Sequence, residues 1–122
     1  MSEVFTVNIP AMAEHLLVAR LAASGVCSRL GMAIEQMEVV KAAVSEAGIL
    51  MINDQSGFGR LAVSFTYGDA LEVSVRGEDP GGVPVSEEID AEFSMALLAA
   101  LADEVEAGGG QVRFTIAGGT NR

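Results

Sequence analysis

Four short segments of this chain alternate apolar and polar residues, and this period of two restricts the possible folds more than any other feature. Because successive side chains of a β-strand point to opposite faces, each segment is predicted to be a strand with one apolar face. The apolar faces consist of Phe5, Val7 and Ile9; Leu61, Val63 and Phe65; Leu71, Val73 and Val75; and Val112, Phe114 and Ile116. A sheet built from such strands needs cover on one side only.

Three longer segments have apolar residues at the spacing of three and four that is typical of helices. The first helix is predicted from about Met12 to Leu30, with Gly31 after it as a helix stop. The second is predicted from about Ile34 to Asn53. The third is predicted from about Glu87 to Val105, with Ser86 as its N-cap and an acidic first turn. The apolar arc of the first helix is predicted to contain Leu16, Leu17, Leu21, Ser24 and Val26.

The predicted element order is therefore β-α-α-β-β-α-β, and Tyr67-Gly68-Asp69 suits a hairpin between the second and third strands. One mainly antiparallel or mixed sheet, covered by helices on one face, satisfies this order. The predicted fold class is α+β, a two-layer α/β sandwich. Because no linker divides the chain, residues 1–122 are predicted to form a single domain, with a flexible end in the last few residues.

The charge of the chain excludes one class of partner. The formal net charge is -10, and the seven basic residues form no stripe, so nucleic-acid binding is disfavoured. The acidic surface suits solubility or a partner with a basic face. No apolar run is long enough to span a bilayer, and Met1-Ser2-Glu3 lacks the basic start of a signal peptide. We therefore expect a cytoplasmic protein without a membrane segment.

Two single residues carry little chemistry by themselves. Cys27 is the only cysteine, so there is no internal disulfide and no thiolate metal site, and a buried structural thiol is favoured. His15 is the only histidine and has no second ligand at a useful spacing. A surface histidine is favoured, and no metal site is predicted.

Several stretches together resemble one known family. Val18-Ala19-Arg20-Leu21 lies in the first helical segment, Val44-Ser45-Glu46-Ala47 in the second, and residues 100–105 at the end of the third. The chain is similar there to the anti-sigma-factor serine kinases of the histidine-kinase-like ATPase superfamily. The similarity spans about Val4 to Ile116 and is most specific in the second helix. It implies a histidine-kinase-like ATPase fold, whose element order is the predicted one.

The resemblance also implies where a nucleotide site would lie. In that family a helix glutamate acts as general base, and an asparagine one turn later holds the magnesium ion. Glu46 matches the glutamate, but Leu50 stands in place of the asparagine and has no oxygen for a hard cation. Asn53 lies on roughly the same helix face, one turn too far for the same ion.

The loops that would hold the nucleotide are altered as well. The family has an Asp-x-Gly loop for adenine near the position of Gly77. Here Asp79-Pro80-Gly81 has the residue types of that motif, but in a shifted register. An ordinary turn explains these residues too. The family has a Gly-rich phosphate loop before the last helix. Residues 89–95 contain no glycine there and include acidic residues, which repel phosphates.

The relic pocket implied by the resemblance thus consists of Glu46, Leu50, Asn53, Gly77 and Asp79. It is expected to bind ATP weakly or not at all, so neither a cofactor nor a metal is predicted. Glu46 would be a relic general base. A structural role for it is favoured over catalysis, because a base without metal and phosphate clamp has nothing to act on.

Arg20 matches an arginine on the partner-binding face of the family, although a solvent-facing arginine explains it equally well. The resemblance further implies a homodimer through the first strand and first helix. The first hypothesis is a regulator that docks onto a sigma factor or an anti-anti-sigma (STAS-type) protein without phosphorylating it. The alternatives are an active serine kinase that uses ATP, magnesium and Glu46, and a small-ligand sensor built on the relic pocket.

Overall fold

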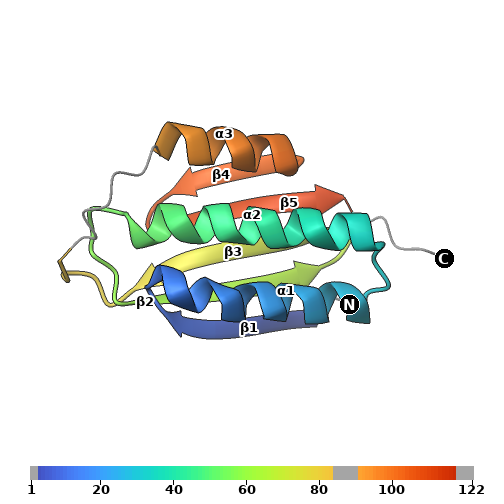
Figure 1. Cartoon of the computed structure of the whole chain (residues 1–122), viewed down its shortest axis with the longest axis horizontal. Helices are drawn as coiled ribbons and strands as arrows, with labels where there is room; N and C mark the ends of the chain where they lie inside the picture. The colour runs from blue at the N-terminus through green and yellow to red at the C-terminus, as the bar shows by residue number, and fades with distance from the viewer. Residues whose placement is uncertain (1–2, 84–90, 118–122) are drawn as a thin grey trace.

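The computed structural model describes residues 3–83 and 91–117. These residues form two layers, a sheet and a set of helices that cover one of its faces (Figure 1). No helix of the described residues covers the other face of the sheet, which is called the uncovered face below. The predicted two-layer α+β sandwich is therefore confirmed.

The sheet contains five strands in the order β1-β2-β3-β5-β4, and all neighbours are antiparallel. The strands are β1 (Glu3–Pro10), β2 (Arg60–Tyr67), β3 (Ala70–Glu78), β4 (Glu104–Gly108) and β5 (Gln111–Ala117). The register sets one apolar row across the sheet: Val7 lies opposite Val63, Val63 opposite Val75, and Val75 opposite Val112. This row faces the helices, as the period of two predicts.

The helices are α1 (Leu16–Arg29), α2 (Ile34–Ile52) and α3 (Ala91–Leu101), and a short 3-10 turn, η1 (Ala13–His15), precedes α1. Figure 1 shows α2 along the middle of the sheet, between α1 above β1 and β2 and α3 above β4. Consequently α2 packs against both other helices, and its buried residues form the centre of the core. No helix in residues 3–83 or 91–117 is long and apolar enough to cross a membrane.

The third helix was predicted too long. It ends at Leu101, and Glu104–Gly108 form β4 instead of the last helical turn. Glu104 to Ala107 also alternate, and pairing with β5 places Val105 opposite Phe114 on the apolar face. Tertiary pairing thus overrides the helical preference of a Glu- and Ala-rich stretch. The predicted start of this helix, Ser86 and residues 87–90, lies outside the described residues, as do residues 118–122.

The buried face of α1 also differs from the prediction. Leu17 and Leu21 are 53% and 61% exposed, so they lie outside the core. The residues that pack inward have the helical spacing of three and four and are mostly small: Leu16, Ala19, Ala23, Val26 and Cys27. Small side chains allow α1 to lie close to its neighbours, and the two leucines are then left on the outer surface.

Cys27 is fully buried, as the sequence predicted for a structural thiol. Burial removes water from around the thiolate and raises the pKa of Cys27 from 9.0 to about 11. The thiol is therefore protonated at neutral pH and is a poor nucleophile.

Two loops at one end of the sheet are held together through their backbones. Gly81 N donates to Ser56 O at 2.7 Å, and Gly82 N donates to Gly57 O at 2.9 Å. Phe58 belongs to the loop after α2, and its ring lies against Gly77 of β3. A Cβ atom added to Gly77 would lie 2.1 Å from Cδ2 of Phe58. The loop after α2 and the loop after β3 therefore form one packed unit.

We expect Gly77→Ala to lower the free energy of unfolding by about 1–3 kcal/mol, because the new methyl group overlaps the Phe58 ring. Gly68→Ala is the control, since a Cβ atom at Gly68 meets nothing within 4 Å. Urea denaturation of both variants measures the difference. Equal stability of the two variants would contradict the packing of Phe58 on Gly77.

A second prediction concerns pH. A folded-state pKa of about 11 lies above the unfolded value near 9.0, so the stability that burial of the protonated thiol provides is lost between about pH 9 and 11. Relative to Cys27→Ala, wild-type protein should lose about 2–3 kcal/mol of unfolding free energy across this range. Denaturant titrations at several pH values measure it. The same pH dependence in Cys27→Ala would rule out the thiol as its cause.

Candidate functional site

Three of the five relic-pocket residues lie on α2 or directly after it, but they do not share one site. Leu50 and Asn53 line a hollow at the C-terminal end of α2, whereas Glu46 is not among its lining residues. Gly77 and Asp79 do not line it either. The structure thus brings two of the five residues together.

The hollow has a volume of about 370 Å³ and lies between the end of α2, the start of α3 and the turn from β4 to β5. Its described walls are formed by Leu50, Met51, Asn53, Asp54, Gln55, Ala91, Met95 and residues 107–112. The turn consists of Gly108, Gly109 and Gly110, all with positive φ. Because glycine adopts such angles without steric cost, the turn can be tight and leaves this rim free of side chains.

Asn53 has one satisfied and one unsatisfied polar atom. Its Nδ2 donates to Ile49 O at 2.8 Å, which satisfies a carbonyl group at the end of α2. Its Oδ1 exposes less than 1 Å² and accepts no hydrogen bond. A buried polar atom without a partner costs about 1–3 kcal/mol. The next residue, Asp54, accepts a hydrogen bond from Ser56 N at 2.8 Å.

Glu46 is half-buried on α2, one position after Ser45. Leu50, one turn further along, has no oxygen that could complete a magnesium site with the Glu46 carboxylate. Within the described ranges, no group of three or more His, Cys, Asp or Glu side chains is arranged to hold a metal ion. Leu50 therefore does not fit the place of the magnesium ligand that the resemblance implies.

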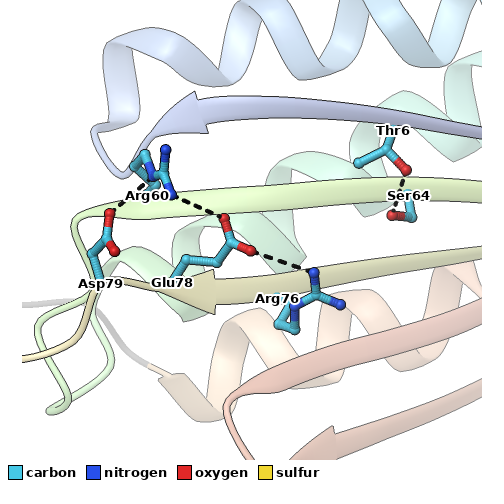
Figure 2. A network of polar contacts seen from close by, with 6 residues as sticks. All are labelled: Thr6, Arg60, Ser64, Arg76, Glu78 and Asp79. Atoms are coloured by element: carbon cyan, nitrogen blue, oxygen red, sulfur yellow. Dashed lines mark hydrogen bonds and ion pairs between the residues drawn. The ribbon is translucent and has the colours of Figure 1, made fainter.

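Asp79 and its neighbours form a network of ion pairs on the uncovered face of the sheet (Figure 2). Arg60 Nε lies 2.9 Å from Asp79 Oδ2, and Arg60 also lies 3.7 Å from Glu78. Arg76 lies 3.4 Å from Glu78 on the other side. Figure 2 shows the Asp79 carboxylate beside Arg60, with the helices behind the sheet. Asp79 is thus engaged away from the hollow, and the Phe58 ring covers Gly77.

Further along the same face, Thr6 and Ser64 join β1 to β2 through a hydroxyl–hydroxyl hydrogen bond of 3.0 Å (Figure 2). Arg113 of β5 pairs with Glu106 of β4 and with Glu72 of β3. Both carboxylates raise the pKa of Arg113, Glu106 most strongly. The outward polar positions of the strands therefore pair with each other across the sheet.

Arg20 lies in a groove between α1 and α2 with a volume of about 350 Å³. The described walls of this groove are Leu17, Arg20, Leu21, Glu38, Lys41, Ala42 and Ser45. Arg20 donates a long hydrogen bond of 3.5 Å to Ser45 Oγ, and Lys41 pairs with Glu38 at 3.1 Å. The groove thus combines two exposed leucines with two cations and one carboxylate.

Sequence reasoning singled out Arg20 but missed this groove, because it assigned Leu17 and Leu21 to the core. The available signal was the small residues Ala19 and Ala23, which occupy the inward face of α1 with the right spacing. His15 is the last residue of η1 and is partly exposed, in agreement with the prediction of a surface histidine.

The relatives found among known proteins belong to one family. No family model matches the chain. It is 37% identical over 76 residues to the serine-protein kinase RsbW of Bacillus mycoides and to that of Bacillus cereus strain Q1, and each match covers 60% of this chain. The chain spans about half of these relatives, since each match covers 48% of their length. It is 32% identical over 118 residues to RsbW of Oceanobacillus iheyensis, across 81% of this chain and 75% of that protein.

Proposed function

This chain belongs to the family of the serine-protein kinases RsbW, and from that premise we propose that it is an anti-sigma-factor-like regulator that acts by docking. It binds a sigma factor or an anti-anti-sigma protein of the STAS type and blocks the partner's other contacts. It does not transfer phosphate from ATP to that partner.

The observation that carries the second half of this proposal is the position of Leu50. Its apolar side chain lines the hollow at the end of α2, one turn beyond Glu46, where a magnesium ligand would be needed. The carboxylate of Asp79 supports the same conclusion, because it is held by Arg60 on the uncovered face of the sheet. Phosphoryl transfer depends on positioning and charge neutralisation, and neither is provided by these residues.

The groove between α1 and α2 supports docking. Leu17 and Leu21 are more than half exposed on either side of Arg20, and exposed apolar groups beside a cation are typical of protein interfaces. Lys41 is paired with Glu38, so Arg20 is the cation of this groove that pairs with no carboxylate among the groove's described lining residues, and it favours a partner segment with a carboxylate next to apolar side chains. Arg20 would pair with that carboxylate.

A homodimer is part of the proposal. β1 is an edge strand of the sheet, paired only with β2 within the described residues, and its Val4 and Phe5 are 63% and 37% exposed. An exposed edge with apolar side chains is a template for pairing with a second chain. The β1 edges of two copies would join their sheets.

We expect Arg20→Glu to abolish capture of the partner, because the new carboxylate repels the acidic group that Arg20 would bind. The protein is used as bait in lysate of its native cell, and captured proteins are identified by mass spectrometry. Arg76→Glu is the control, since it makes the same charge change on the uncovered face of the sheet. A sigma factor or STAS-type protein retained by Arg20→Glu as well as by wild type would exclude this docking face.

We further expect isothermal titration calorimetry with ATP and magnesium to detect no binding at micromolar concentrations, because the oxygen ligand at position 50 is missing. The control is Leu50→Asn, which places a carboxamide one turn after Glu46. Micromolar binding by wild type, or labelling of the captured partner from radioactive ATP, would favour the alternative of an active kinase with Glu46 as base.

A further inference from the structure

The hollow at the C-terminal end of α2 has the size of a small-molecule site. Its volume of about 370 Å³ falls in the lower part of the range of about 300–1,000 Å³ that is usual for ligand pockets. The hollow is lined by the C-terminal end of α2, whereas the docking groove is lined by positions 38 to 45 of the same helix. The two sites share no lining residue, and the inference drawn here does not rest on the docking proposed above.

The walls of the hollow favour a ligand with an apolar body. Leu50, Met51, Met95 and Val112 contribute side chains from α2, α3 and β5. Methionine side chains are flexible and polarisable, and they adapt to aromatic rings. The glycine turn from β4 to β5 leaves the rim open, so a flat group can enter along it.

The polar groups of the hollow favour a donor that carries positive charge. Among its described lining residues there is no lysine, arginine or histidine, whereas Asp54 contributes a carboxylate. Asn53 Oδ1 is an acceptor without a donor. Because less than 1 Å² of this oxygen is exposed, a donor that approaches it must shift the carboxamide slightly.

The two helix ends at the hollow act in opposite directions. The C-terminal end of α2 has partial negative charge, and its last turn contains no basic residue. The described start of α3 has partial positive charge, which Glu92 in its first turn offsets. The full negative charge of Asp54 therefore decides the sign, and phosphates or carboxylates are disfavoured.

We infer that this hollow binds a small amine, cationic at neutral pH, with an apolar or aromatic body. The ammonium group lies near Asp54 and the carboxamide of Asn53, and the apolar body lies between Leu50, Met95 and Val112.

Tryptamine and indole-3-acetate test this inference, because they share the indole ring and have similar side chains of opposite charge. Each is titrated into the full chain labelled with ¹⁵N, and backbone amide shifts are followed by NMR. Tryptamine should bind and shift the amides of Leu50, Asn53, Gly109 and Gln111. Indole-3-acetate should bind at least several-fold more weakly. Equal or tighter binding of indole-3-acetate, no binding of tryptamine at millimolar concentration, or shifts confined to other residues would each overturn the inference.

Two matched variants test the role of Asp54. Asp54→Asn keeps the oxygen that accepts from Ser56 N but removes the charge, and should weaken tryptamine binding about three- to fivefold. Asp69→Asn removes the same charge from the exposed turn between β2 and β3 and should leave the affinity unchanged. An equal loss in both variants would show only a general effect of net charge and would overturn the assigned contact.

Discussion

The apolar row that crosses the sheet from β1 to β5 is the interaction on which the rest of the structure depends. Val63 and Val75 are fully buried in it, and they lie beneath the helical layer with Val44 and Ala47 of α2. Burial of such side chains contributes about 1.5–3 kcal/mol each. Because only one face of the sheet is apolar, all three helices must share that face, and α2 is left in the middle with a neighbour on each side.

This central place lets α2 line two separate depressions of the surface. Residues toward α1, including Lys41 and Ser45, line the groove that contains Arg20. Residues at its C-terminal end, including Leu50 and Asn53, line the hollow next to α3. A helix whose core contacts are fixed by the sheet can change its side chains on one of these flanks without disturbing the other. A change of side chains near Leu50 is therefore compatible with an unchanged groove around Arg20.

Most of the fold could be predicted from the sequence, because periods of two and of three to four are read directly from the residue order. β4 could not, since a stretch of Glu, Val and Ala fits both a helix and a strand, and only β5 decides between them. Of the five residues of the predicted relic pocket, the structure brings Leu50 and Asn53 together at one hollow. Leu50 lies in the last turn of α2 and Asn53 is its C-cap, so their spacing was informative. Asp79 was not predictable, because its contact with Arg60 joins two strands and depends on the side to which the loop turns.

The two loops joined by Gly81 and Gly82 have a consequence for how such a protein diverges. The hydrogen bonds that join the two loops run between backbone groups, so these bonds do not depend on which side chains the loops carry. Where the two loops touch, a side chain at either glycine would collide with backbone: a Cβ atom added to Gly57 would lie 2.1 Å from Gly82 O, and one added to Gly82 would lie 2.9 Å from Gly57 O. Positions away from these two glycines and from the contact of Phe58 with Gly77 can therefore change without breaking the backbone bonds between the loops. The residues of a recognition motif can therefore be substituted one at a time in such loops while the backbone keeps its path.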